Sequence, residues 1–288
     1  MNRIAVVTDS NSGITQKEAI DLGIKVLAMP FTIGDKEYFE DITLSQSEFY
    51  KKLEDDEEIF TSQPAVAQVL ELWDELLKEY DEIIYIPMSS GLSSSYQTAR
   101  MLAQDYDGKV QVVDNVRISL TLRHAIYDAI NYVKQGKSAK EIKDILEDTK
   151  LDASIYIMVD TLKYLKKGGR VTAAGAAIGT VLNIKPVLQI QGDKLDAFAK
   201  VRGMKQAKKT MLDALAKDIE TRFKDVYEAG KLRIGVAHTN NEEVAKEFAE
   251  ELKSIYNIET MDIDPLSLSV SCHIGPGSLA VACDVVQD

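Results

Sequence analysis

Three clusters of hydroxyl side chains could bind an anion or a polar head group. They are residues 8–10 (TDS), 61–64 (TSQP) and 89–95 (SSGLSSS), and each borders a short apolar run. Loops at the carboxyl ends of parallel strands present the free N–H groups of the helices that follow them, which favours bound anions. Serine and threonine are also common helix N-caps, so capping alone explains any single cluster. Three converging clusters, however, predict a bound anion or polar head group.

A serine nucleophile is the first alternative. Residues 91–95 (GLSSS) keep the first glycine and the central Ser93 of the GxSxG nucleophile elbow, but Ser95 stands in the place of the last glycine. His273 lies in SCHIGPG (271–277), which we expect to form a turn that could bring a histidine to a ligand. No acidic residue is recognisably placed to complete a triad. An esterase or thioesterase that uses Ser93 and His273 stays open as an alternative.

Other chemistries have less support in the sequence. It contains neither GxxxxGK[ST] nor GxGxxG after a strand, which weighs against ATP, NAD and a third hypothesis, a kinase-like or phosphatase subunit. The aspartates at strand ends lack metal-ligand spacing, so we expect them to cap helices, and we expect His124 to have a core or surface role. Two cysteines without a CxxC or a Cys/His cluster predict no zinc site and no disulfide framework.

Composition limits the class of partner. The 288 residues carry 34 Lys and Arg against 46 Asp and Glu, a net charge of −12. Such a balance argues against nucleic acid and against anionic membranes, both of which attract positive proteins. The first apolar run, IAVV, is too short for a signal peptide, and no stretch approaches the ~18 apolar residues of a membrane span. We therefore expect a reduced, soluble, cytoplasmic protein without stable membrane insertion.

One segment departs from this acidic balance. Residues 161–209 contain eleven Lys or Arg but only two acidic residues, a local net charge of +9 that leaves −21 for the rest of the chain. A solvated helix face explains part of this charge. The whole segment nevertheless predicts a positive surface that attracts an anionic ligand or an acidic partner.

The first half of the sequence alternates apolar runs with helical patterns, which predicts an α/β fold with a mainly parallel sheet. Capping boxes at Thr15/Glu18, Ser45/Glu48 and Ser138/Glu141 predict helix starts, and Pro64 is expected in the first turn of another helix. The expected strands are 4–10, 24–31, 82–89 and 109–114, with a hairpin through Gly34-Asp35 and a long helix over 118–136.

The second half restarts the pattern at residue 154, so we expect two α/β domains, 1–150 and 151–288. Its expected helices are 161–169, the small-residue segment 173–183, 203–224 and 241–254. Its expected strands are 154–160, a hairpin that turns at Gly192-Asp193, 232–238 and two final strands.

Taken together, these motifs resemble the DegV family of bacterial fatty-acid-binding proteins over nearly the whole chain. The fragments that carry the resemblance are TDS (8–10), TSQP (61–64), SSGLS with Tyr96-Gln97 (89–97), VDTLKYLKKGGR (159–170), NIKPVL (183–188), Arg202 and HIGPG (273–277). Each fragment is modest alone, and their order and spacing make the match specific.

The resemblance implies a carrier rather than an enzyme. In that family, a bound fatty acid is presented to a separate fatty acid kinase, which phosphorylates its carboxylate to an acyl phosphate that passes to phospholipid synthesis, so an acyltransferase is a further partner. The head group is expected at the domain interface and the tail in an apolar tunnel, with no cofactor besides the bound fatty acid. By matching motif, the carboxylate-binding set is Thr61, Ser62, Ser93 and His273. Arg170 and Arg202 resemble the basic positions for engaging the kinase or the acyl phosphate.

Two loops of this sequence depart from the family pattern. Ser94-Ser95 stands where the family more often has Gly-Thr, and Asn115 follows Asp114 where a serine is usual. Side chains added at Ser94-Ser95 either alter the approach of the phosphate or face solvent, and Asn115 leaves the role of its own loop open.

Overall fold

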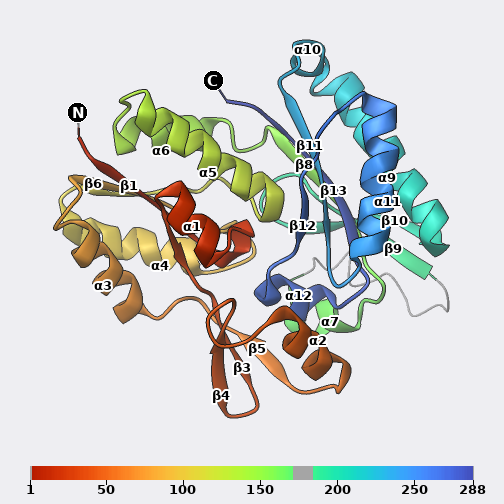
Figure 1. The fold of residues 1–288 in the computed structure, drawn as a ribbon, viewed down its shortest axis with the longest axis horizontal. Helices are drawn as coiled ribbons and strands as arrows, with labels where there is room; N and C mark the ends of the chain where they lie inside the picture. The colour runs from red at the N-terminus through yellow and green to blue at the C-terminus, as the bar shows by residue number, and fades with distance from the viewer. Residues whose placement is uncertain (1, 171–183, 288) are drawn as a thin grey trace. The chain divides into compact units, whose positions relative to one another are not determined.

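The chain divides into two compact units, Met1–Leu151 and Asp152–Gln287. The computed structural model describes residues 2–170 and 184–287 (Figure 1). That each unit is an independently folding domain stays a prediction. The small-residue helix expected over 173–183 lies outside the described residues. Among the helices that are described, none combines the length and the apolar composition that crossing a membrane requires.

The first unit is built on a parallel four-stranded sheet in the order β2-β1-β6-β7. Its strands are β1 (Ile4–Asp9), β2 (Lys25–Leu27), β6 (Glu82–Ile86) and β7 (Val110–Val112). All six residues of β1 are buried, as expected for a strand in a parallel sheet covered on both faces. The predicted α/β class and the predicted parallel sheet are confirmed.

Three helices of this unit begin where the sequence places their caps. All three predicted capping boxes are present, at the starts of α1, α2 and α6. The helices are α1 (Gln16–Leu22), α2 (Gln46–Glu54), α3 (Val66–Leu76), α4 (Ser95–Leu102), α5 (Ser119–Lys134) and α6 (Ala139–Asp148), with short 3₁₀ turns η1 (Ser10–Ser12) and η2 (Ala103–Tyr106).

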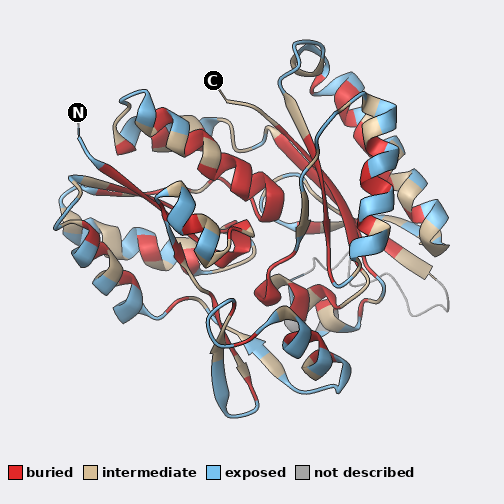
Figure 2. Ribbon diagram, in the orientation of Figure 1, coloured by how far each residue is buried: buried red, intermediate tan, exposed pale blue. Residues whose placement is uncertain are grey.

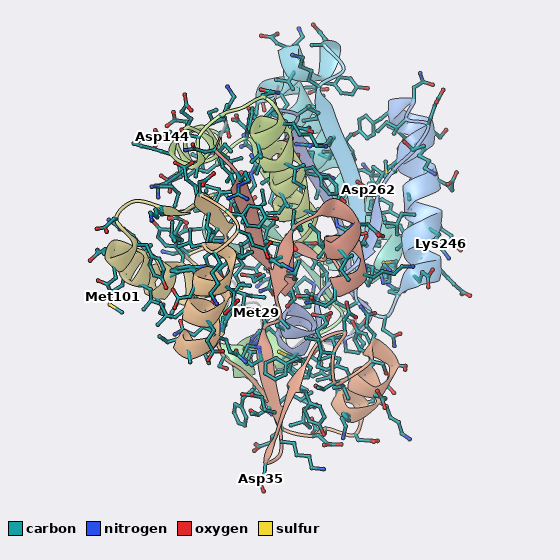
Figure 3. The ribbon with its side chains drawn as sticks, turned by 60° about the vertical axis from the view of Figure 1, so that its left-hand side comes forward. Met29, Asp35, Met101, Asp144, Lys246 and Asp262 are labelled. Carbon is teal, nitrogen blue, oxygen red and sulfur yellow. The ribbon has the colours of Figure 1, made fainter. Side chains whose placement is uncertain are left out.

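Two local predictions were wrong in this unit. The apolar run 24–31 is not one strand, because it divides between β2 and β3 (Pro30–Ile33), which belongs to a separate antiparallel sheet in the order β4-β3-β5. Proline has no N–H to continue the first ladder. That second sheet contains the predicted hairpin between β3 and β4 (Lys36–Phe39), with Asp35 at its tip, and β5 (Ile59–Thr61) (Figure 3).

Pro64 is the other error. It precedes the helix instead of lying in its first turn, because α3 begins at Val66 and its N-cap, Ala65, still has extended backbone angles of φ −61° and ψ 138°.

The second unit contains a six-stranded mixed sheet in the order β10-β9-β8-β13-β11-β12, in which only the β11–β12 pair is parallel. Its strands are β8 (Ala153–Met158), β9 (Ile184–Ile190), β10 (Leu195–Arg202), β11 (Leu232–His238), β12 (Ile263–Pro265) and β13 (Leu279–Val285). The predicted hairpin between β9 and β10 is confirmed.

Two long helices, α9 (Gly203–Thr221) and α11 (Glu242–Tyr256), share a hydrophobic core with this sheet. Met211 of α9, Phe248 of α11 and Val236 of β11 are all fully buried in that core. Figure 2 shows both helices with buried residues along one side and exposed residues along the other, the pattern of helices that cover a sheet.

Three shorter helices complete the unit, α7 (Lys163–Gly168), α10 (Lys224–Glu228) and α12 (Leu268–Ile274). The turn expected around His273 was wrong, because this residue lies in the last turn of α12. Burial of Leu268, Cys272 and Ile274 explains why so short a segment becomes helical.

Candidate functional site

Asp9 organises the first hydroxyl cluster, at the carboxyl end of β1. Its Oδ1 accepts hydrogen bonds from the backbone N and the Nδ2 of Asn11, both at 2.9 Å, and its Oδ2 accepts one from Met88 N at 2.9 Å. Asp9 is completely buried, and burial raises its pKa although these three donors lower it. The predicted capping role of Asp9 is confirmed at η1, and the same carboxylate joins the loops after β1 and β6.

Ser93, in the serine-rich loop, is paired with Ser95. The two hydroxyl oxygens lie 2.5 Å apart, and Ser95 N donates to Ser93 Oγ at 3.2 Å. Ser95 is buried at the start of α4, whereas Ser94 is exposed. Serine in place of threonine at position 95 therefore keeps a hydroxyl, which contacts Ser93 directly, and the side chain added at position 94 is exposed.

The Thr61-Ser62 cluster is tied to the other two clusters within the same unit. Thr61 ends β5 opposite Phe31, and Ser62 N donates to Pro30 O at 3.2 Å. The next residue, Gln63, accepts a 2.9 Å hydrogen bond from Thr98 Oγ1 of α4, the helix that begins at Ser95.

Met29 connects the Thr61-Ser62 cluster to the first one. Its N donates to Ser10 Oγ at 3.1 Å, and it precedes Pro30, the acceptor of the Ser62 bond (Figure 3). A short series of hydrogen bonds thus links the three hydroxyl clusters that the sequence singled out.

His273 belongs to the second unit. Burial is the main cause that lowers its pKa to about 4, and the positive charge of Arg170 lowers it further. The imidazole is therefore neutral at pH 7, and in this form one ring nitrogen is a donor and the other an acceptor. A neutral imidazole can donate a hydrogen bond to a carboxylate without adding a buried charge.

Arg170 and Arg202 occupy the ends of two elements in the same unit. Arg170 follows the C-cap of α7, and Arg202 ends β10 opposite Ile184 and is the N-cap of α9. Both side chains are exposed. Among the described contacts, none joins one of these arginines to the other.

Part of the positive charge around these arginines is locally neutralised. Lys185 pairs with Asp160, Lys208 with Glu247 at 3.9 Å and Lys209 with Asp213 at 2.7 Å, and all three acidic partners lie outside the basic segment 161–209. The local field is therefore weaker than the net charge of the segment suggests.

The remaining candidates have structural roles. His124 is a buried residue of α5, in keeping with the core alternative, and His238 Nδ1 accepts a 3.2 Å hydrogen bond from Asn241 N. Cys272 and Cys283 are free and buried, and burial raises the pKa of the Cys272 thiol to about 12. Within residues 2–170 and 184–287, no three His, Cys, Asp or Glu side chains gather in a group that could hold a metal ion.

Two further residues shape the first unit's loops, and sequence reasoning missed the first of them. Thr98 binds a residue 35 positions away, and nothing in its local sequence indicates that partner. Asn115 is buried, and its Oδ1 accepts a 3.2 Å hydrogen bond from Arg117 N, so its side chain turns the loop after β7.

Known proteins are similar to this one over nearly the whole chain. The family model described as "Uncharacterised protein, DegV family" matches residues 3–285. A DegV domain-containing protein of Staphylococcus aureus (strain N315) is 30% identical over 285 residues, which are 98% of each chain. The protein is thus an α/β protein of the DegV type, and the chain belongs to the DegV family.

Two solved structures of this family are similar as well. The first is a DegV family protein from Thermus thermophilus whose structure is described as showing fatty acid binding. It matches with a TM-score of 0.88 and 28% identity over 98% of this chain and 99% of its own. DegV of Bacillus subtilis, described as a fatty acid binding protein, matches with a TM-score of 0.86 and 29% identity over 99% of this chain and 100% of its own.

Proposed function

We propose that this protein binds a long-chain fatty acid and presents it to a separate kinase, which phosphorylates the carboxylate to an acyl phosphate. The observation that carries the first part is the end-to-end similarity to two solved structures whose names describe fatty acid binding. The second part rests on the family resemblance and on the exposed arginines of the basic segment. An acyltransferase would then use the acyl phosphate as its acyl donor for phospholipid synthesis.

The carboxylate-binding set of this proposal is Thr61, Ser62, Ser93 and His273. Hydroxyl and neutral imidazole donors suit an ionised carboxylate, which only accepts hydrogen bonds. The hydrogen bonds that tie Ser62 to Pro30 and Ser93 to Ser95 support this assignment, because they restrict the donors before a ligand arrives.

The tail supplies most of the affinity in this proposal. A palmitate-like acid has about 14 methylenes, and at ~0.8 kcal/mol each their transfer from water contributes at most about 11 kcal/mol. Each hydrogen bond to the carboxylate contributes about 1.5–3 kcal/mol. Apolar burial then determines affinity and chain-length preference, while the polar set fixes which end of the ligand the kinase meets.

The kinase provides the nucleotide and the metal in this scheme, so the chain acts as carrier and needs no nucleophile. An esterase that used Ser93 and His273 would need its serine hydroxyl aligned with a base. Among the described hydrogen bonds, those of the Ser93 hydroxyl go to Ser95, which supports a binding role for this hydroxyl. Ester hydrolysis by the purified chain, abolished by Ser93→Ala, would instead establish the esterase.

The kinase step is tested with protein loaded with palmitate, a purified bacterial fatty acid kinase and ATP. Arg202→Glu should reduce acyl phosphate formation at least about tenfold, because it reverses one charge on the basic segment 161–209 that we propose docks the kinase. The amount of bound lipid, measured after extraction, should stay unchanged. Lys217→Glu is the matched control, because Lys217 is also exposed but lies on α9 outside the basic segment. Loss of lipid in Arg202→Glu would place this arginine in the ligand site instead.

His273→Ala separates orientation from retention. The variant should weaken acyl phosphate formation more than fatty acid retention, because the tail still holds the ligand while the head group loses a donor. Equal retention together with equal phosphorylation would remove His273 from the proposed set.

A further inference from the structure

Thr239 holds the turn that follows His273. This residue comes directly after β11 and has no exposed surface. Its backbone N donates to Ser278 O at 3.2 Å, and its backbone O accepts from Gly277 N at 2.7 Å. Any residue except proline could make these two bonds, so they fix the course of the chain but do not require a threonine.

The Thr239 hydroxyl adds two bonds that only a threonine or serine makes. Its Oγ1 donates to Gly275 O at 2.6 Å and accepts from Ser278 N at 2.9 Å. Gly275 is the C-cap of α12, and its N donates to Ser271 O at 2.8 Å. The hydroxyl therefore fixes the end of α12 two residues after His273.

Tyr164 of α7 limits the same helix end from another direction. A Cβ added to Gly275 would collide with the ring of Tyr164, so only glycine allows this close approach. The positive φ of 77° at Gly275 also favours glycine. With the carbonyl of Gly275 bonded to Thr239 and its α-carbon against Tyr164, the last turn of α12 has little freedom to shift.

We propose that Thr239 is a positioning residue for His273, because its hydroxyl fixes the helix end that carries the imidazole toward the carboxylate of a bound fatty acid. This inference rests on the proposed function, in which His273 contacts the carboxylate. A purely structural role would stabilise the second unit without controlling the imidazole, and the two roles predict different results.

The test replaces the hydroxyl with a methyl group of similar size. Thr239→Val should shift the side-chain ¹³C and ¹⁵N resonances of His273 and raise the Kd for palmitate about tenfold. Thr239→Ser should return the resonances to their wild-type positions and the Kd to within about twofold of the wild-type value. If Thr239→Val does not fold, Thr239→Cys replaces it in the test. Its thiol is a weak donor, so the resonances and the Kd should change in the same direction but by a smaller amount.

Ser154→Ala is the matched control. Ser154 is a buried residue of β8 whose Oγ accepts from Arg222 Nη1 at 2.5 Å and from Gln191 Nε2 at 3.2 Å, and in the sheet it lies opposite Cys283, away from the turn. Its loss should destabilise the same unit without moving the His273 resonances. Unchanged His273 resonances in Thr239→Val, or equal shifts in Ser154→Ala, would overturn the inference.

His273→Ala distinguishes this inference from the proposed function. If His273→Ala binds palmitate and supports phosphorylation like the wild type, the proposed role of His273 fails, and so does the functional part of this inference. If His273→Ala is impaired while Thr239→Val has normal His273 resonances and normal binding, the proposed function stands and the role of Thr239 alone is rejected.

Discussion

The two units bring polar side chains together in different ways. In the four-stranded sheet of the first unit the strands are parallel, so the loops after β1 and β6 begin at the same edge of that sheet, and the Asp9 carboxylate joins them. In the second unit β11 and β13 are antiparallel, with His238 opposite Leu279, and the hydroxyl of Thr239 binds the turn that leads into β13. A buried carboxylate thus joins two loops in the first unit, and a buried hydroxyl holds one turn in the second.

The comparison predicts that the carboxylate matters more for stability. Asp9→Ala removes the carboxylate that accepts hydrogen bonds from Met88 N and from the two nitrogens of Asn11, so it should lower the free energy of unfolding by about 4 kcal/mol. The measurement is urea denaturation followed by far-UV circular dichroism.

Asp144→Ala is the matched control for this change. Asp144 is exposed on α6 and pairs with Lys140 one helical turn away, so its loss should cost about 0.5 kcal/mol or less (Figure 3). Equal losses in the two variants would contradict the organising role of Asp9.

The two units should also respond to pH in opposite directions. Because burial lowers the pKa of His273 from 6.5 to about 4, the unfolded chain binds more protons than the folded one between these values. Stability from this residue is complete above pH 6.5 and falls by about 3 kcal/mol as the pH drops toward 4. Burial raises the pKa of Asp9, so its contribution instead falls as the pH rises from 3.8 through the raised pKa.

Denaturation of wild type and His273→Asn between pH 4 and 7.5 measures the histidine contribution. The wild type should lose more stability than the variant as the pH falls. Parallel curves for the two proteins would show that His273 does not titrate with a lowered pKa.

A smaller effect is expected at the head-group set of the first unit. Ser93→Ala removes one donor to the carboxylate and should raise the Kd for palmitate about tenfold, equivalent to about 1.4 kcal/mol. Isothermal titration of delipidated protein gives the Kd. Ser94→Ala, at the exposed neighbour, should bind like the wild type, and a similar loss there would point to a change in the whole loop.

The smallest effect is expected at Thr98. Thr98→Val breaks the hydrogen bond to Gln63 and should lower the free energy of unfolding by about 1 kcal/mol, because a neutral pair contributes little net. Thr98→Ser keeps the hydroxyl and should retain most of the stability. Hydrogen exchange of residues 61–64 shows whether the loop becomes more mobile in Thr98→Val, as the link between the clusters predicts.

The sequence was most informative where partners are close along the chain. The three capping boxes join residues three positions apart, so their spacing alone predicts the contact. Where residues 24–31 divide into two strands, Met29 N bonds to Ser10 Oγ, nineteen positions away. The same limit hid the helix at His273, whose formation depends on burial of Leu268 and Cys272 against the rest of its unit.

The residues proposed to bind the carboxylate could be named from family motifs. The residues that hold the surrounding loops through hydrogen bonds could not. Thr98 and Thr239 act through partners that no local spacing indicates. Long-range hydrogen bonds of this kind follow from strand order and register, and the alternation of apolar and polar residues does not specify either.

Native mass spectrometry of the purified protein, followed by solvent extraction and identification of any released compound, tests the central proposal most directly. The proposal predicts a mass increase that corresponds to one long-chain fatty acid per chain, and the extract then identifies its length and saturation. A ligand-free mass that persists after incubation with saturated, unsaturated and branched fatty acids would contradict fatty acid binding.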